Sequence, residues 1–271
     1  MSSIWFLVRS QLSPRAAAAG LVALTTGALI DDRGTGQRSF QSVAEALACA
    51  RTALGGEDAL SSLTSLRVAF DVVPAPTNKA GQPMATELVL TFPDTFTKTD
   101  RARLVGREVV RTRGVIGDKP RGADQSAEVL RARRSEFARW AMVLLLRETQ
   151  AIPLRWSREP QSDAAHVTIA ATGPDGFKMG LTLDTLTCHP TAATWERPPS
   201  PADAQAGRNA TAGRFVEGYE LSAYKVFDGI RLPTRIRMAT DGTPRFEWTI
   251  TSATVRQRRP DRLDWSRQPR D

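Results

Sequence analysis

The feature that most restricts how this chain folds is an alternation of apolar and polar residues that returns in many short runs. Every second residue is apolar in 66–73 (LRVAFDVV), and the same period recurs in 86–92, 177–184, 232–238 and 246–252. Successive side chains of a strand point to opposite faces of a sheet. Period two over many short runs therefore predicts an antiparallel sheet with one covered face and one wet face.

Turn residues separate these runs and mark a hairpin near the C-terminus. Residues 222–238 (SAYKVFDGIRLPTRIRM) predict two strands joined at Asp228-Gly229, because Asp and Gly tolerate the positive φ of tight turns. The same criteria add strands at 106–118 and 166–172 and turns at 173–176 and 240–242.

Two segments have helical periodicity instead. Residues 42–56 begin at Ser42 with Glu45 three residues later, the pattern of a capping box, and end at Gly55-Gly56. Residues 126–149 have arginines on one face of their first half and an apolar stripe opposite. The stripe consists of Val129, Leu130, Phe137, Trp140, Ala141, Leu144 and Leu145. Between the later strands, residues 196–213 are poor in apolar side chains and predict a long loop.

The N-terminus has the organisation of an export signal. Arg9 and Arg15 are the only charged residues among the first thirty, and an apolar run at 16–30 follows. We expect a signal peptide at 1–30, a linker at 31–42, a folded domain at 43–255 and a basic tail at 256–271. The net charge of +8 suits anionic partners such as membrane head groups. The arginines are spread along strand faces, without the exposed aromatics of a nucleic-acid-binding module, so no nucleic-acid partner is expected.

The two cysteines leave two interpretations open. In an exported protein Cys49 and Cys188 can form a disulfide, which their spacing alone cannot establish. The slightly favoured interpretation is that they are two small buried apolar residues.

Residues suited to catalysis are few. The sequence has no phosphate-binding loop, nucleophile elbow or metal-ligand motif, and the aspartates at 94, 118, 184, 228 and 241 are explained by turns. The only histidines are His166 and His189, so a Ser or Cys hydrolase is the least favoured alternative. We expect no cofactor and no metal.

Five segments, in this order, resemble the periplasmic lipoprotein-carrier superfamily, the LolA/LolB-like proteins, and its outer-membrane lipoprotein-sorting members. They are 53–68 (ALGGEDALSSLTSLRV), 92–99 (FPDTFTKT), 133–146 (RRSEFARWAMVLLL), 181–187 (LTLDTLT) and 223–238 (AYKVFDGIRLPTRIRM). The resemblance implies an α+β fold: a curved antiparallel sheet, an incomplete β-barrel, with helices packed on its concave apolar face. It also implies a periplasmic or envelope location.

The same resemblance implies that acyl chains or lipidated protein cargo are held between sheet and helices, without catalysis and with contact to a membrane surface. The expected cavity-lining residues are Leu90, Phe92, Trp140, Leu144, Met179, Leu181, Ile236 and Trp248. Arg231, Arg235 and Arg237 would then face water on the convex side. The competing interpretation is an envelope interaction module whose core is filled by its own side chains, since one-sided alternation describes that equally well.

Overall fold

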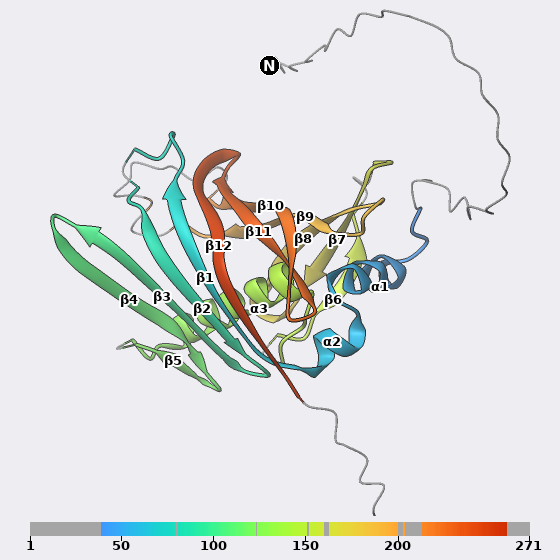
Figure 1. The fold of residues 1–271 in the computed structure, drawn as a ribbon, viewed down its shortest axis with the longest axis horizontal. Coiled ribbons are helices and arrows are strands. Elements are labelled where there is room, and N and C mark those ends of the chain that lie inside the picture. The colour runs from blue at the N-terminus through green and yellow to red at the C-terminus, as the bar shows by residue number, and fades with distance from the viewer. Residues whose placement is uncertain are drawn as a thin grey trace, which may run out of the picture. The chain divides into compact units, whose positions relative to one another are not determined.

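The computed structural model describes residues 39–79, 81–122, 124–150, 152–159, 163–199, 203 and 213–258. The expected signal peptide and most of the expected linker, tail and 196–213 loop lie outside these residues. Within these residues, twelve antiparallel strands form one sheet in the order β5-β4-β3-β2-β1-β12-β11-β10-β9-β8-β7-β6 (Figure 1). The strands are β1 Leu63–Pro74, β2 Met84–Thr91, β3 Thr95–Leu104, β4 Arg107–Ile116, β5 Lys119–Arg121, β6 Arg155–Arg158, β7 His166–Thr172, β8 Lys178–Asp184, β9 Pro190–Arg197, β10 Phe215–Phe227, β11 Ile230–Thr240 and β12 Thr243–Gln257.

The sheet is not closed, because its edge strands β5 and β6 do not pair with each other. Each strand pairs with its neighbour in sequence except β5 and β6, and the first and last strands pair as well. β1 pairs with β12 along their length, from Leu63 opposite Gln257 to Pro74 opposite Phe246. Helix α3, Ala127–Leu145, connects β5 to β6 and therefore runs from one edge of the sheet to the other. β9 and β10 pair although the connection between them, from Arg197 to Phe215, is long. The expected curved, incompletely closed antiparallel sheet with helices is confirmed.

Helix α1, Val43–Leu54, forms as its capping residues predict. The Ser42 side chain accepts a hydrogen bond from the Glu45 amide at 3.1 Å, and the Glu45 carboxylate accepts one from the Gln41 amide at 2.8 Å. The short helix α2, Glu57–Ser62, follows after Gly55 and Gly56, both of which have positive φ. Phe40, inside the segment expected as linker, is buried in the core, so the folded unit begins before residue 43.

Helix α3 begins at the Ser126 cap but ends at Leu145, four residues before the predicted end. Leu146 adopts a left-handed conformation there, and its amide is hydrogen-bonded to helix carbonyls. Arg147 then reaches back to the carbonyl oxygens of Leu60 and Leu63, which stabilises the exit of the chain. In the first half of α3 no residue is buried, and Arg133 and Arg134 are half-buried like Val129 and Leu130 of the predicted stripe, whereas Phe137–Leu145 is buried almost all round.

The core lies between α3 and one face of the sheet. Trp140 of α3 packs against three sheet residues, with ring centroids 5.9 Å from Phe70, 5.3 Å from Trp248 and 5.4 Å from Tyr219. The apolar positions of the alternating runs all point to this side: Val68, Phe70, Leu88, Leu181, Leu232 and Ile236 are fully or nearly fully buried. The helix crossing is visible behind the central strands in Figure 1.

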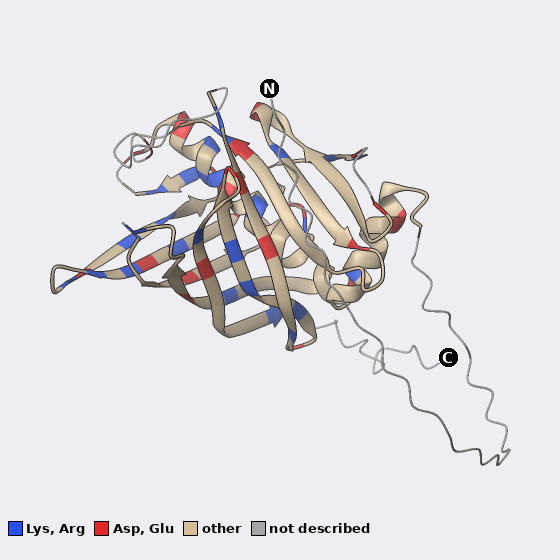
Figure 2. Cartoon of the chain, turned by 90° about the horizontal axis from the view of Figure 1, so that it is seen from above, with Lys and Arg blue, Asp and Glu red and all other residues tan. Residues whose placement is uncertain are grey.

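The opposite face of the central strands is wet and carries charges of both signs, as Figure 2 shows. Arg235 and Arg237 of β11 are exposed there, and both pair with Glu247 on β12, at 2.7 and 3.1 Å. Arg231 is only half-exposed and contacts His189 instead. The hairpin turn at Asp228-Gly229 has positive φ at both residues, as predicted.

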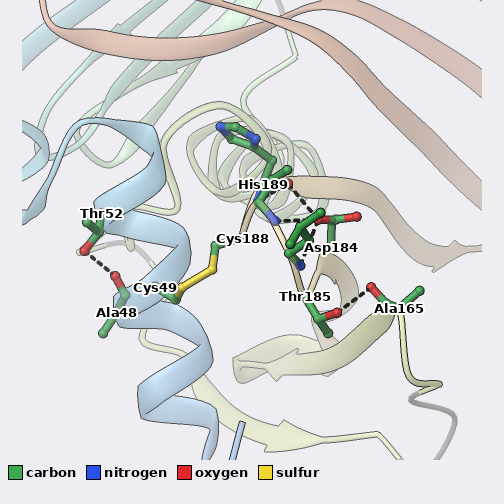
Figure 3. Close-up of a disulfide and its surroundings, with 10 residues drawn as sticks. Ala48, Cys49, Thr52, Ala165, Asp184, Thr185, Cys188 and His189 are labelled. Carbon is green, nitrogen blue, oxygen red and sulfur yellow. Dashed lines mark hydrogen bonds between the residues drawn. A yellow bond between two sulfur atoms is a disulfide. The ribbon is translucent and has the colours of Figure 1, made fainter. Parts of the chain in front are cut away.

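A disulfide joins Cys49 of α1 to Cys188, so the slight preference for two unpaired, buried cysteines is wrong (Figure 3). The Asp184 carboxylate accepts hydrogen bonds from the amides of Leu186 and Thr187, which shapes the turn after β8 and directs Cys188 toward α1. The two Cα atoms are 5.7 Å apart, within the range that a disulfide spans. Sequence spacing carried no information on this approach, because the residues are 139 positions apart.

Candidate functional site

A cavity of about 330 Å³ lies between the concave face of the sheet and α3. Its walls come from seven strands and the helix, and they are of two kinds. The apolar and aromatic wall consists of Met84, Trp140, Trp195, Tyr219, Met238, Phe246 and Trp248. The charged wall consists of Lys98, Asp100, Arg113, Glu136, Arg139 and Glu217. The volume falls within the range of pockets that hold small ligands.

Four aromatic rings form a continuous row along the cavity, in the order Trp248, Trp140, Tyr219 and Trp195. The three successive centroid distances are 5.3, 5.4 and 4.7 Å. Rings at such distances stabilise each other beyond the apolar area that they bury. We call these residues the aromatic row, and they present a rigid apolar surface from the middle of the sheet to β9.

Arg113 holds two carboxylates of the charged wall. Its Nη1 donates to Asp100 at 2.7 Å, while its Nε and Nη2 donate to Glu136 at 3.0–3.1 Å. Arg133 also donates to Glu136, at 3.1 Å, and the Thr86 hydroxyl donates to Asp100 at 2.7 Å. Burial alone would raise the pKa of Glu136, but the neighbouring Arg113, Lys98 and Arg133 charges lower it to about 2. Glu136 is therefore ionised, and both carboxylates are held by hydrogen bonds.

Lys98 of β3 is a buried cation at one end of the aromatic row. Lys98 is only 5% exposed, and its Nζ lies 4.2 Å from the centroid of the Trp248 ring and 5.8 Å from the centroid of the Trp140 ring. The nearest carboxylate oxygen, on Asp100, is 3.8 Å away, beyond hydrogen-bond distance. Burial and the nearby Arg113 lower the pKa of Lys98 to about 8.

Arg139 of α3 is the cation at the other end of the aromatic row. Its guanidinium carbon lies 5.2 Å from the centroid of the Trp195 ring. It is the only charged residue within the buried stretch Phe137–Leu145. Burial lowers the pKa of Arg139, although it remains a guanidinium that is charged at neutral pH. Within the described part of the chain, it donates no hydrogen bond and forms no ion pair.

Glu217 closes the cavity near Arg139 but is held by another partner. Arg197 of β9 donates to the Glu217 carboxylate and also, with both Nη atoms, to Asp203 at 2.6 and 2.8 Å. Asp203 is fully buried although it belongs to the segment predicted as a loop. The acids around the cavity are thus all paired with arginines.

The structure places the eight expected cavity residues in four environments. Trp140 and Trp248 line the cavity and stand in contact within the aromatic row. Phe92 lines a separate hollow of about 640 Å³ beside α2 and the end of β12, under Arg147. Met179 lines a third hollow, of about 530 Å³, over β7–β10. Leu90, Leu144, Leu181 and Ile236 are buried in the packed core and line none of these three spaces.

Sequence reasoning missed the charged wall. The signal was present in β3 (TFTKTDRARL), where the period of two from buried Phe96 carries Lys98 and Asp100 to the same covered face. Polar residues at inward positions obscured the alternation, so the strand itself was not predicted. We regard the cavity as the candidate site because, of the three spaces, it is the most enclosed and has the most aromatic wall.

The two histidines lie outside this cavity. His166 contacts Asp163 at 3.3 Å, and His189 stacks on Tyr224 with ring centroids 4.4 Å apart. Burial, followed by the charge of Arg231, lowers the pKa of His189. Both cysteine sulfurs are joined in the disulfide, so neither is a thiol nucleophile. No group of three metal-ligating side chains occurs among the residues that the structure describes.

Known proteins similar to this chain were found by structure but not by sequence. No family model matches the sequence, and no curated protein matches it. A LolA superfamily protein from Nitrosomonas europaea is 14% identical over 78% of this chain and 95% of its own, with a TM-score of 0.40. An outer membrane lipoprotein-sorting protein domain from Vibrio parahaemolyticus is 9% identical over 73% and 87%, with a TM-score of 0.34.

A DUF1329 family protein from Desulfovibrio piger is 10% identical over 79% of this chain and 92% of its own, with a TM-score of 0.36. The resemblance to LolA/LolB-like proteins noted in the sequence is thus found again among solved structures. All three identities are below 25% and all three TM-scores are below 0.5, so these neighbours do not support a functional assignment. The functional proposal rests on the cavity and its side chains.

Proposed function

We propose that this protein is an envelope binding protein or carrier that holds an apolar chain reversibly between its sheet and α3, without catalysing a reaction. The observation that carries the proposal is the cavity of about 330 Å³ with the aromatic row as its wall. Ligand sites are concave and mostly apolar, with a few polar groups, so a space of this size lined by four aromatic rings favours a ligand over a filled core.

The energetics suit reversible binding. Each buried methylene is worth about 0.8 kcal/mol, so a chain of about a dozen carbons gains about 10 kcal/mol. Association costs about 4–15 kcal/mol in lost freedom, so a cost in the lower half of that range leaves a modest net affinity. A carrier needs this balance because it has to release its cargo.

An oxidising location is part of the proposal. The disulfide between Cys49 and Cys188 supports a periplasmic or envelope site, because disulfides persist in oxidising compartments and are rare in reducing ones. Among the described residues, no helix has the length and apolar character needed to cross a membrane. Lipidated protein cargo or free lipid would both provide a suitable chain.

Binding of an uncharged apolar probe tests the proposal. N-phenyl-1-naphthylamine should bind with a Kd of micromolar or tighter, seen as increased probe fluorescence and quenched tryptophan emission. Met238→Trp, which adds bulk at the cavity wall, should weaken binding at least tenfold. Val226→Trp, at a position 57% exposed on β10, is the matched control and should leave binding unchanged.

The competing interpretation is an interaction module without a ligand. Four of the expected lining residues do pack in the core, which is the observation in its favour. Absence of probe binding, together with no lipid retained in native mass spectrometry of protein purified gently from its own envelope, would decide for that module.

A further inference from the structure

Among the charged side chains of the cavity, those that still lack hydrogen-bond partners within the described residues are donors. Asp100 and Glu136 accept five hydrogen bonds from Arg113 and Arg133, and Asp100 accepts another from Thr86. Glu217 is engaged by Arg197. Lys98 and Arg139, in contrast, donate no hydrogen bond to any described residue, and both border the cavity. An ammonium offers three donors and a guanidinium five, so the ligand that satisfies them carries acceptors.

These two cations also lie at the two positions where the ends of an apolar chain bound along the aromatic row would be. Lys98 lies over Trp248 and Arg139 lies over Trp195, at opposite ends of the aromatic row. Buried cations without acceptors are unfavourable unless something pairs with them. Lys98 is buried, with the Asp100 oxygen 3.8 Å away, and Arg139 is half-buried over Trp195. An acyl chain alone would offer neither residue a hydrogen-bond acceptor, whereas an anionic head group beside either one would form charge-assisted hydrogen bonds.

From this arrangement we infer that Lys98 and Arg139 each form a head-group subsite, one at either end of the aromatic row, and that the ligand is an amphipathic anion, an aliphatic chain with a carboxylate or phosphate head. The chain lies along the aromatic row, and the head is bound at a cation at its end. This inference rests on the proposed function and adds to it the chemical class of the ligand. A free inorganic anion would leave the apolar and aromatic wall without a contact, and a neutral chain would leave the cations of the charged wall without a hydrogen-bond acceptor.

The experiment compares four competitors of the N-phenyl-1-naphthylamine probe, each below its critical micelle concentration: dodecanoate, dodecyl phosphate, dodecanol and inorganic phosphate. With the wild-type protein at pH 7, the two anionic chains should displace the probe at concentrations at least tenfold lower than dodecanol. Inorganic phosphate should not displace it. Comparison of dodecanoate with dodecyl phosphate distinguishes a carboxylate head from a phosphate head.

Two variants assign the preference to the subsite. Lys98→Met and Arg139→Met should each reduce the preference for anionic chains over dodecanol at least fivefold and leave the affinity for dodecanol within threefold of wild type. Lys225→Met, at an exposed position of β10, is the matched control and should keep the full preference. Circular dichroism confirms that each variant is folded, and the second variant keeps the test valid if one does not fold.

The preference should also depend on pH in a defined direction. The charged groups facing Lys98 are Asp100 on its own strand, Arg113 on β4, and Glu136 and Arg133 on α3. Of the facing groups with a resolved pKa, Glu136 titrates near pH 2, so around pH 8 it is Lys98 that loses its charge. In Arg139→Met, the preference for dodecanoate should be present below about pH 8 and decline above it.

Each result has one meaning. Equal displacement by dodecanoate and dodecanol, or a full preference that survives in both variants, overturns the head-group assignment and leaves the apolar-chain proposal intact. Displacement by inorganic phosphate at the concentrations at which dodecyl phosphate acts overturns the amphipathic class. Failure of the probe and of every chain to bind overturns the proposed function, and the head-group assignment with it.

Discussion

Replacing Lys98 by methionine should make the free protein more stable at neutral pH. Burial and the charge of Arg113 lower the pKa of Lys98 from 10.5 to about 8, so the charged form is unfavourable in the folded state. That shift corresponds to about 3 kcal/mol. Loss of the cation–π contacts with Trp248 and Trp140 offsets about 1–2 kcal/mol of it. We therefore expect Lys98→Met to raise the free energy of unfolding by about 1–2 kcal/mol at pH 7.

The sign of the pH dependence follows from the two pKa values. Below pH 8, Lys98 is protonated in both the folded and the unfolded chain, and the unfavourable contribution is fully present. Between about pH 8 and 10.5 the folded protein releases the proton first, so wild-type stability rises relative to the variant. Urea denaturation at pH 7 and at pH 10, with the disulfide intact, should show the advantage of Lys98→Met shrinking at the higher pH.

The matched control is Lys225→Met, the same chemical change at an exposed position of β10. We expect its midpoint to change by less than about 0.5 kcal/mol at either pH. If Lys98→Met lowers the stability at pH 7 by more than about 1 kcal/mol, the ammonium is stabilised by its neighbours, and it is not a strained group held ready for a ligand. A residue whose removal stabilises the fold and weakens binding is the pattern expected of a functional site.

Three further outcomes test the architecture. Reduction of the Cys49–Cys188 disulfide should lower the free energy of unfolding by about 2–5 kcal/mol, measured by urea denaturation with and without reductant; no change would show that α1 is held by packing alone. Glu136→Gln should cost about 3–5 kcal/mol, because it removes the carboxylate that pairs with both Arg113 and Arg133 and leaves Arg113 with Asp100 alone. Since the pKa of Glu136 is lowered to about 2, its contribution is present above its ordinary pKa of 4.5 and is lost as the pH falls toward 2, so the cost should shrink in acid; a constant cost would contradict the assignment. Trp140→Ala should cost about 3–5 kcal/mol in thermal or urea unfolding, and an unchanged midpoint would place α3 away from the sheet.

Local sequence patterns were sufficient to predict those helices and strands in which every residue fits the pattern of the element. The strands at 66–73 and 177–184 were found because their inward residues are uniformly apolar, and α1 because Ser42 and Glu45 form its capping box. Strand β3 was missed for the opposite reason. Its inward side chains after Phe96 are Lys98 and Asp100, so the functional wall of the cavity interrupts the pattern from which a strand is predicted.

Contacts between distant segments were beyond sequence reasoning. The approach of α1 to the turn after β8, which brings Cys49 and Cys188 together, depends on how the whole sheet curves. The partition of the apolar positions likewise depends on packing: Trp248 borders the cavity, whereas Ile236, paired with it across β11 and β12, is sealed in the core. Alternation identifies the covered face but not which part of that face remains open.

The pairing of β1 with β12 has a consequence for how the chain acquires its structure. These strands meet across nearly the full length of the folded unit: the Thr251 hydroxyl bonds the Ala69 carbonyl, 182 positions away. Without β12 the strands form two separate ribbons, β5 to β1 and β11 to β6, each with a long unpaired edge. Neighbouring hairpins close quickly, but joining the ribbons requires the closure of a very large loop, which is slow. Completion of the core is therefore a late event that waits for the last strand, and an incomplete chain presents open edges to which other strands can add.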